Sequence, residues 1–294
     1  MKFVITGANG HIGKRLIRSL FDRGEKDIVA LVRSDRAART LRDEGFDVDV
    51  QVVNYADAAG IRAAVGRCDV VFHLIGIIKE SKANPFELAH EAACQALRDA
   101  DLGATTIINL GIVGSDPNSP NACLRSRARA ESILMTGPSR VIGLRVPMVL
   151  GEGDYASFAL GRNARKSVAL TYRAGSIEQP VDCQDVIAAL LSAAETPLES
   201  GVLELAGPES LSRTALIKRA GQLLGHQPKV ISLPLWSGLV LAAALEKLSS
   251  NPPVTRAMLG VLDHDDRVDT REACMALGIS LTPLDETLKR VLIF

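Results

Sequence analysis

The sequence predicts an α/β fold in which a parallel β-sheet is covered by helices on both faces. Two observations in the first half of the chain carry this prediction. Short apolar runs, typical of buried strands, alternate with longer segments whose apolar residues recur about every 3.6 positions, as Ile12, Leu16, Ile17 and Leu20 do. Strands that alternate with helices indicate parallel βαβ units, in which the crossover helices bury both faces of the sheet.

Each expected strand of this half is a run of mostly apolar residues. The six runs are Lys2–Thr6, Ile28–Val32, Val48–Val53, Val70–Ile75, Thr105–Leu110 and Val141–Val149. Of the helices between them, one has a clear start signal. Asn84 is expected to be its N-cap, with Pro85 at the first helical position and Glu87 at the third.

After about Gly151 the pattern changes to short strands mixed with helices. The strands expected here are Val168–Tyr172, Val202–Leu205 and Val230–Leu233, and the helices are Gln184–Glu195, Arg213–Leu224 and Leu235–Leu248. Thr282 and Pro283 open a last helix. We therefore expect residues 1–150 to form one domain and residues 151–294 a smaller mixed α/β region, with a soft boundary because C-terminal elements can return to the first sheet.

Composition excludes several classes of protein. The chain has 294 residues, 47% of them apolar, with 34 Lys and Arg against 34 Asp and Glu, so its net charge predicts no nucleic-acid partner. The cysteines are odd in number and lack CxxC spacing, which argues against a disulfide framework or a zinc site: Cys68, Cys94, Cys123, Cys183 and Cys274. This use of cysteine indicates a reducing compartment and hence a cytoplasmic location.

Neither a targeting segment nor a membrane span is expected. Met1–Thr6 is too short for the core of a signal peptide. The most apolar later stretch, Leu233–Leu245, contains Pro234 and Gly238 and falls short of the ~20 apolar residues that a span requires. We interpret it as a buried or interfacial helix.

A glycine-rich loop follows the first expected strand and precedes a helix. It contains Gly7, Gly10 and Gly13, separated by Ala8, Asn9, His11 and Ile12. Glycines at this spacing allow a sharp turn, a close approach of the backbone to a pyrophosphate, and tight packing of the helix on the sheet. Because the motif lies between a strand and a helix, it predicts a dinucleotide site in a Rossmann-type, doubly wound sheet.

The end of the second strand bears on the choice between the two nicotinamide dinucleotides. An acidic residue there binds the ribose 2′-hydroxyl of NAD, but this chain has Arg33 and Arg36, whose guanidinium groups match the oxygens of a 2′-phosphate. We therefore favour NADP(H). NAD(H) remains open because Asp35 lies between the two arginines.

Two further segments are expected to line the crevice. Asn54 and Tyr55, after the third strand, are placed to flank the adenine. Leu74, Ile75 and Gly76, after the fourth, are placed along the dinucleotide.

Several segments resemble the extended and atypical short-chain dehydrogenases/reductases. They are Thr6–Gly13, Leu31–Arg33, Asp69–Gly76, Leu144–Gly151, Gln179–Val186, Leu205–Glu209, Val254–Arg256 and Leu281–Leu284. Together they most resemble the branch that contains the nucleotide-binding accessory subunit of respiratory complex I and its bacterial relatives. The likeness covers nearly the whole chain. It implies a respiratory-chain or quinone-linked protein partner and a position peripheral to a membrane complex.

The resemblance also shows where this chain departs from the family. Active members use a Tyr-x-x-x-Lys pair and a serine or threonine near the end of the fifth strand, with the tyrosine moving a proton and the lysine lowering its pKa. At these positions this chain has Cys123, Arg127 and Gly111. Arg127 retains the charge to bind ribose or phosphate, but a guanidinium does not relay protons.

The sequence offers only weak candidates for a proton donor that could replace the tyrosine. Cys123 is one, with Lys79 just past the fourth strand and Tyr155 just past the sixth, and His11 and His73 are lesser candidates. Each is more simply interpreted as a surface or packing residue, because no second group with a fixed role accompanies it. The run from His264 to Asp266 resembles a metal-binding pattern but is expected to be an exposed turn, so no metal site is predicted.

Three functions remain in competition. The leading hypothesis is an NADP(H)-binding protein with a structural, accessory or redox-sensing role. The second is an NADP(H)-dependent reductase or nucleotide-sugar epimerase with a substitute acid, and the third is a pure interaction module with an empty crevice. Whether the chain is an enzyme is left open.

Overall fold

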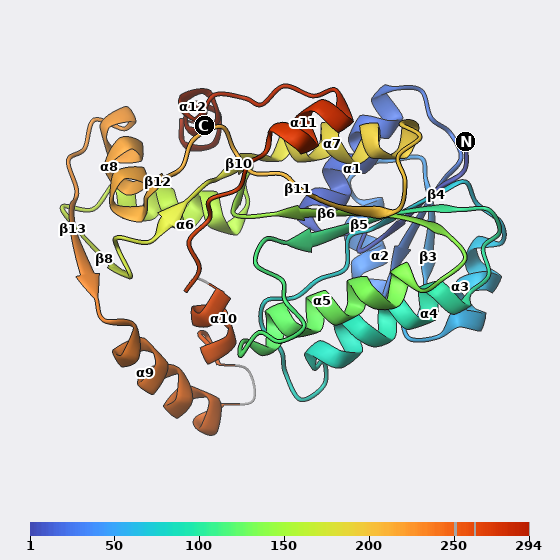
Figure 1. Ribbon diagram of the computed structural model, residues 1–294, viewed down its shortest axis with the longest axis horizontal. Coiled ribbons are helices and arrows are strands. Elements are labelled where there is room, and N and C mark those ends of the chain that lie inside the picture. The colour runs from blue at the N-terminus through green and yellow to red at the C-terminus, as the bar shows by residue number, and fades with distance from the viewer. Residues whose placement is uncertain (250–251, 262, 294) are drawn as a thin grey trace. The chain divides into compact units, whose positions relative to one another are not determined.

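The computed structural model describes residues 1–249, 252–261 and 263–293, which form two compact units (Figure 1). The first unit comprises Met1–Arg145 and Ile187–Leu203, and the second comprises Val146–Val186 and Glu204–Phe294. The units are interleaved along the chain. A segment from the second half returns to the first unit and places strand β11 (Gly201–Glu204) in its sheet.

The first unit is built on a seven-stranded sheet with the order β11-β6-β5-β4-β1-β2-β3. Its other strands are β1 (Phe3–Thr6), β2 (Ile28–Val32), β3 (Asp49–Val52), β4 (Val70–His73), β5 (Thr106–Ile112) and β6 (Arg140–Val146). Strands β1 to β5 pair in parallel, with Ile5 between Ala30 and Phe72. Every residue of β1, β2 and β4 is buried, as expected of strands covered on both faces. The predicted fold class is confirmed.

Helices cover both faces of this sheet (Figure 1). Their bounds are α1 (His11–Asp22), α2 (Asp35–Arg42), α3 (Ala58–Val65), η1 (Glu87–Ala92), α4 (Ala93–Asp99), α5 (Ala122–Met135) and α7 (Cys183–Glu195). Helices α3, α4 and α5 lie on one face, and α1 and α7 on the other. The core under α3–α5 joins strand residues such as Val71 to helix residues such as Leu97 and Leu134.

The order of the strands places a crevice beside β1. From β1 the chain adds β2 and β3 on one side, then returns to add β4, β5 and β6 on the other. The loops that leave the carboxyl ends of β1 and β4 therefore run in opposite directions. In open α/β sheets, ligands bind in the crevice at this switch point.

The strand expected at Val141–Val149 is interrupted in the structure. The run Val141–Val149 is divided into β6 and β7 (Val149–Leu150), and β7 pairs with β10 (Val181–Asp182) in a separate sheet. Pro147 lies between them and has no amide hydrogen to continue a ladder.

The helix expected to be capped by Asn84 starts one residue later than expected. Asn84 exchanges backbone hydrogen bonds with Ser81 in a turn, and the carboxylate of Glu80 accepts from the Phe86 amide at 3.2 Å in its place. The helix begins at Phe86 and continues as the π-helix η1. Such wide turns in helices are often found at functional sites.

The second unit has smaller sheets and several helices. Its strands are β7, β8 (Val168–Tyr172), β9 (Ile177–Glu178), β10, β12 (Leu211–Ser212) and β13 (Lys229–Leu233), and its helices are α6 (Tyr155–Ala164), α8 (Arg213–Leu223), α9 (Leu235–Leu248), α10 (Arg256–Val261), α11 (Arg271–Leu277) and α12 (Leu284–Leu292). One core of this unit packs Leu160, Leu216, Ile217 and Leu288 together.

Helix α9 is the stretch interpreted above as a buried or interfacial helix. Only Gly238 and Ala242 of this helix are buried, whereas Trp236 and Val240 are more than 60% exposed. A buried helix is therefore wrong. No helix among the described residues is both long and apolar enough to cross a bilayer.

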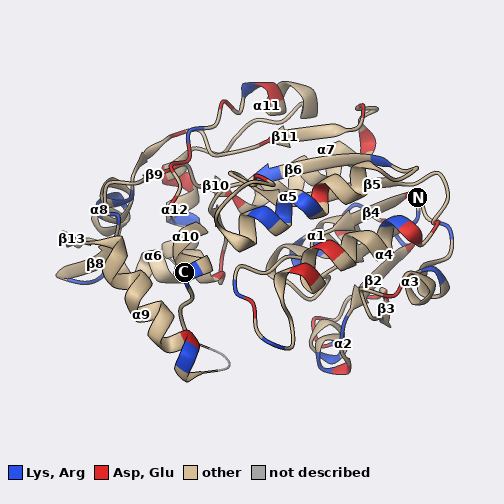
Figure 2. Cartoon of the chain, turned by 60° about the horizontal axis from the view of Figure 1, so that its bottom comes forward, with Lys and Arg blue, Asp and Glu red and all other residues tan. Residues whose placement is uncertain are grey.

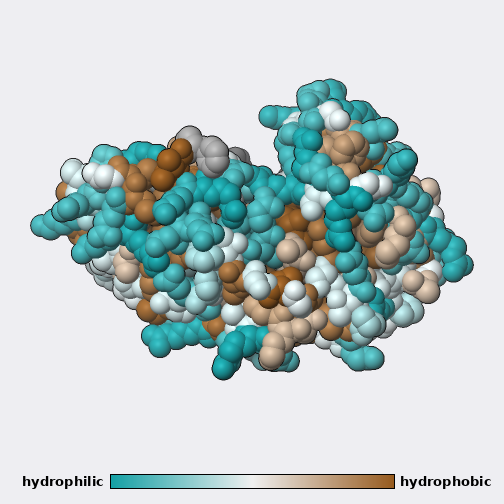
Figure 3. Space-filling model, turned by 90° about the horizontal axis from the view of Figure 1, so that it is seen from above, coloured by the Kyte–Doolittle hydropathy of each residue, from teal (hydrophilic) through white to brown (hydrophobic). Residues whose placement is uncertain are grey.

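In the view of Figure 2, residues of both charges occur on most of the described elements. Lys and Arg are interspersed with Asp and Glu along the elements, with basic residues concentrated on α5 (Figure 2). On the side shown in Figure 3, hydrophobic residues form separate patches among hydrophilic ones.

Candidate functional site

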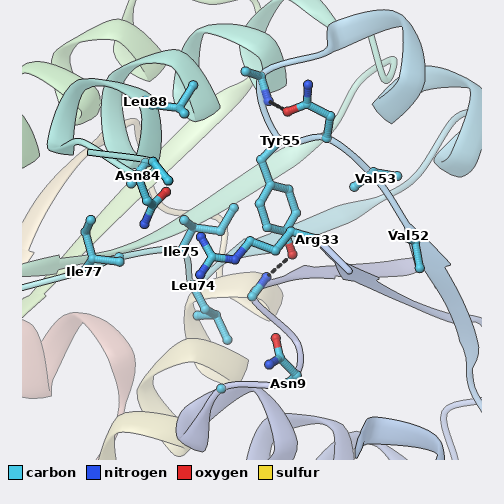
Figure 4. A pocket seen from close by; sticks show the side chains of 17 residues that line it. Asn9, Arg33, Val52, Val53, Tyr55, Leu74, Ile75, Ile77, Asn84 and Leu88 are labelled. Carbon is cyan, nitrogen blue, oxygen red and sulfur yellow. Dashed lines mark hydrogen bonds between the residues drawn. The ribbon is translucent and has the colours of Figure 1, made fainter. Parts of the chain in front are cut away.

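A cavity of about 540 Å³ lies in the first unit, at the carboxyl ends of β1 to β4 (Figure 4). Its wall is formed by the glycine loop, the ends of β2 and β3, the segment after β4, and η1. The lining residues are Gly7, Asn9, Gly10, Arg33, Val52, Val53, Asn54, Tyr55, Ala56, Leu74, Ile75, Gly76, Ile77, Ala83, Asn84, Leu88 and Ala89. The cavity therefore lies at the switch point of the sheet.

The glycine loop has a shape that side chains would not permit. Gly7 has a φ of +69°, and a Cβ there would lie 3.2 Å from the Leu74 carbonyl. A Cβ on Gly13 would lie 2.7 Å from the carbonyl oxygens of Gly7 and Ala8. Helix α1 follows with Gly10 as an N-cap that provides no side-chain hydrogen bond. The amides at its start are left for an anionic ligand, so this cradle fits a pyrophosphate.

Tyr55 holds the glycine loop in place. Its hydroxyl donates to the Leu31 carbonyl at 2.6 Å and accepts from the Gly7 amide at 3.0 Å. Burial raises the pKa of Tyr55 to about 12, so the hydroxyl keeps its proton. The side chain lies at the wall of the cavity and ties the loop after β1 to the end of β2 (Figure 4). Next to it, the Asn54 side chain accepts from the Ala56 amide at 3.1 Å and stabilises the turn.

The two arginines after β2 differ in position. Arg33 lines the cavity, and its side chain extends past Tyr55 (Figure 4). Arg36 is exposed in the first turn of α2 and does not belong to the lining. Asp35 is the acidic residue of the same turn, where a carboxylate interacts favourably with the helix dipole.

Arg127, on α5, lies against Gly76 of the cavity lining but is not itself part of the lining. Its Nη1 donates to the carbonyls of Ile75, at 3.1 Å, and of Leu110, at 3.2 Å. A Cβ built on Gly76 would overlap the guanidinium, so a glycine is needed there. The Nε atom is buried and has no hydrogen-bond partner among the described residues.

Two neutral histidines accompany Arg127. His73 contacts Thr6 Oγ1 at 3.0 Å and Cys94 Sγ at 3.4 Å, and His90 Nε2 accepts from the Ile77 amide at 3.1 Å. Burial, and then the charge of Arg127, lower the pKa of each histidine to about 3. Both rings are therefore uncharged at neutral pH.

The weak substitute donors do not gather around the cavity. Cys123 is fully buried and donates to the Ile77 carbonyl at 3.3 Å, and burial raises its pKa to about 11. Lys79 is half-buried after β4 and is not in the lining. Tyr155 is 76% exposed at the start of α6, in the second unit. His73 is uncharged, and His11 contacts Arg15 at 3.3 Å on α1.

The run from His264 to Asp266 is not a free turn. The Ile177 amide donates to Asp265 at 3.0 Å, and the Asp266 amide donates to the Ile177 carbonyl at 2.9 Å, so the segment lies along β9. In the part of the chain that the structure describes, no group of three potential ligands could hold a metal ion.

The expected site residues divide into two groups. The cavity lining contains Gly7, Asn9, Gly10, Arg33, Asn54, Tyr55, Leu74, Ile75 and Gly76. His11, Ile12 and Gly13 belong to the start of α1, Arg36 to α2 and Arg127 to α5, and none of these five lines the cavity.

Sequence reasoning missed the wall made by Ala83, Asn84, Leu88 and Ala89. The only available signal was the proximity of this segment to the end of β4.

Comparisons with known proteins agree with this geometry. Residues 7–134 match a family model described as NAD(P)H-binding. A ceramide reductase of Caulobacter vibrioides is 27% identical over 264 residues, which cover 87% of this chain and 81% of that protein. The mitochondrial NADH dehydrogenase [ubiquinone] 1 alpha subcomplex subunit 9 of Dictyostelium discoideum is 21% identical over 297 residues, covering 98% of this chain and 83% of the subunit.

Solved structures show the same fold. Triphenylmethane reductase of Citrobacter sp. superposes with a TM-score of 0.76 at 20% identity, covering 100% of both chains. UDP-glucuronic acid 4-epimerase of Bacillus cereus, in complex with NAD, superposes with a TM-score of 0.74 at 16% identity, covering 100% of this chain and 98% of the epimerase.

The sheet, the glycine cradle and the matched model define an NAD(P)-binding protein with a Rossmann fold. Within that class, the comparisons support a similarity to the atypical short-chain dehydrogenases/reductases, near the branch that contains the subunit of respiratory complex I.

Proposed function

We propose that this protein binds NADP(H) as a resident ligand and has a structural, accessory or redox-sensing role. The observation that carries the proposal is the intact glycine cradle. It is supported by the resemblance, which assigns the positions of the catalytic tyrosine and lysine to Cys123 and Arg127. Gly7, Gly10 and the start of α1 would hold the pyrophosphate, and Arg33 would hold the 2′-phosphate, with Arg36 nearby. When bound, NADPH would supply a hydride and NADP⁺ would accept one.

The residues around the replaced positions are poor proton carriers. Cys123 keeps its proton because burial raises its pKa to about 11. Arg127 keeps its charge because guanidinium does not deprotonate in proteins. His73 and His90 stay neutral, since the pKa of each is about 3. None of these four groups changes protonation near neutral pH, as a general acid or base must.

The preference for NADP(H) depends on Arg33. A charge-assisted hydrogen bond contributes about 1.5–3 kcal/mol, which is about 10-fold to 150-fold in affinity. We expect Arg33→Ala to weaken NADPH binding within that range and to leave NADH binding nearly unchanged. Arg39→Ala is the matched control, because Arg39 is exposed on α2 and outside the lining.

The direct test is calorimetry of the purified protein with NADPH, NADP⁺, NADH and NAD⁺. Mass spectrometry of small molecules released on denaturation shows in addition whether a dinucleotide copurifies. If none of the four ligands binds, the proposal is wrong, and the empty-crevice interaction module takes its place.

The accessory role is supported by the similarity to the Dictyostelium subunit over 98% of this chain. We propose that the protein works peripherally, on a respiratory-chain or quinone-linked assembly, from the cytoplasmic side. Native electrophoresis of membranes from cells that express a tagged chain tests this. Migration of all the tagged protein as a free monomer would contradict it.

A reductase is the second candidate, favoured by the similarity to ceramide reductase over 87% of the chain. We would measure NADPH oxidation with ceramide, quinones, other carbonyl compounds and nucleotide sugars. Turnover that Tyr155→Phe or Cys123→Ala abolishes would favour the enzyme over the accessory protein. Turnover that neither variant changes would exclude these two residues as substitute acids.

A further inference from the structure

We propose that Arg127 makes this site discriminate between the oxidation states of the dinucleotide, so that the reduced form binds more tightly than the oxidised form. This inference rests on the proposed dinucleotide binding and deepens it. It gives Arg127 a role in determining which oxidation state the site prefers. The guanidinium of Arg127 is buried and charged, and it forms no ion pair with a carboxylate of the described residues.

The charge of Arg127 is not neutralised by neighbouring side chains. Its hydrogen bonds go to the backbone carbonyls of Ile75 and Leu110, and no ion pair joins it to a carboxylate within the described ranges. Glu131, one turn further along α5, forms an ion pair with Arg145, which donates hydrogen bonds of 2.6 and 3.2 Å to its carboxylate. Carbonyl dipoles compensate only part of a full positive charge, so the surroundings of Arg127 remain electropositive.

The groups around Arg127 do not change this balance at neutral pH. His73 and His90 are neutral, and they share with Arg127 the lining of a small internal space of about 10 Å³. Burial keeps the thiols of Cys94 and Cys123 protonated, with pKa values of about 12 and about 11. Of these five groups only Arg127 is charged, and Glu131, in the same lining, is paired with Arg145.

Arg127 also lies on the half of the sheet that would face the nicotinamide. The loop after β1 separates two halves of the crevice, one over β1–β3 with Arg33 and the other over β4–β6. Ile75 and Leu110 belong to the second half, and the guanidinium lies directly against Gly76, which lines the cavity. If Arg33 takes the adenosine phosphate, the other end of the dinucleotide extends toward Arg127.

The two oxidation states differ in charge at that end. The oxidised nicotinamide ring is a cation, and the reduced ring is neutral. Two like charges within several ångströms of each other, at an effective dielectric constant of about 20, repel strongly enough to change an equilibrium constant by tenfold or more. We therefore expect NADPH to bind at least about tenfold more tightly than NADP⁺. A tenfold preference for the reduced form raises the potential of the bound two-electron couple by about 30 mV.

The experiment is calorimetry of NADPH and NADP⁺ with the full-length protein and three variants. Arg127→Gln removes the charge, and the ratio of the two dissociation constants should fall toward 1. Arg127→Lys keeps the charge, and the ratio should stay near that of the wild type. Arg125→Gln is the matched control on the same helix, because Arg125 binds the Ser119 carbonyl at 2.6 Å, outside this cluster, and its loss should leave the ratio unchanged.

Each result has a distinct meaning. Equal affinities of the wild type for NADPH and NADP⁺ would overturn this inference and leave the proposed function standing. An unchanged ratio in a folded Arg127→Gln variant would also overturn it. If no dinucleotide binds, both proposals fail. Should Arg127→Gln not fold, the wild-type ratio and the potential of the bound couple still decide the question.

Discussion

The phenolic oxygen of Tyr55 lies 3.0 Å from the amide nitrogen of Gly7, although 48 positions separate the two residues. The same oxygen donates to the Leu31 carbonyl at 2.6 Å. One side chain after β3 therefore connects the loop after β1 to the end of β2.

Replacement of Tyr55 by phenylalanine tests this connection. The change leaves the Leu31 carbonyl and the Gly7 amide without their partner, so we expect a loss of about 1–3 kcal/mol in the free energy of unfolding. A looser glycine loop should also weaken dinucleotide binding severalfold. Denaturant unfolding and calorimetry measure the two effects. Tyr155→Phe is the control, since Tyr155 is 76% exposed, and equal losses in both variants would refute the explanation.

Gly13→Ala should destabilise the protein although the site is helical. Alanine in a helix is favoured over glycine by about 1 kcal/mol. Here the added Cβ would lie 2.7 Å from the carbonyl oxygens of Gly7 and Ala8, both backbone atoms that cannot move aside without distorting the loop. We expect the melting temperature to fall and dinucleotide affinity to be lost.

The matched control for this change is Gly175→Ala. A Cβ on Gly175 would have no neighbour within 4 Å, and the residue has no positive φ. Its melting temperature should stay within the error of the wild-type value. An unchanged melting temperature for Gly13→Ala would mean that the loop adapts.

Acidic pH should destabilise the protein through His73 and His90. Both have a pKa of about 3 in the folded state, below the value of about 6.5 for unfolded histidine. Between these values the unfolded chain binds more protons. The free energy of unfolding therefore falls as the pH decreases from about 6.5 toward 3, by at most about 1.4 kcal/mol per pH unit for each histidine.

Denaturant unfolding at pH 7.5, 6 and 5 measures this dependence. His90→Gln should reduce the slope, whereas His226→Gln should not, because His226 is exposed. A slope that His90→Gln leaves unaltered would show that other groups cause the acid sensitivity.

Asp266 should lower the stability of the protein at alkaline pH rather than at acidic pH. Burial, and then the nearby charge of Glu178, raise its pKa to about 7, above the value of about 3.9 for an unfolded aspartate. The folded state therefore binds more protons between these values, and the stability contributed by the protonated form is lost as the pH rises toward and through 7.

Asp266→Asn mimics the protonated form. Because the side chain is only partly buried, we expect a modest gain of about 1–2 kcal/mol at pH 8 and little change at pH 4. Asp47→Asn on an exposed segment is the control. A gain of equal size at both pH values would contradict the assignment to Asp266.

Local patterns determined many elements of the fold. The bounds of β2, β8 and α9 match the expected ones, because each segment is mostly apolar and is followed by a charged residue or a serine. The glycine loop was also recognisable, since its strand, its glycines and its helix are adjacent in the chain. The helix near Asn84 was misplaced because its capping carboxylate comes from Glu80, outside the usual spacing.

The sequence by itself thus determined the fold class, the glycine cradle and the position of Arg33, all of which follow from residues next to one another. Only the tertiary structure decided that Tyr55 holds Gly7 and that Arg127 lies against Gly76 beside neutral His73 and His90. Those contacts join residues from separate strands and helices. Their chemistry depends on burial and on nearby charges, which no local pattern specifies.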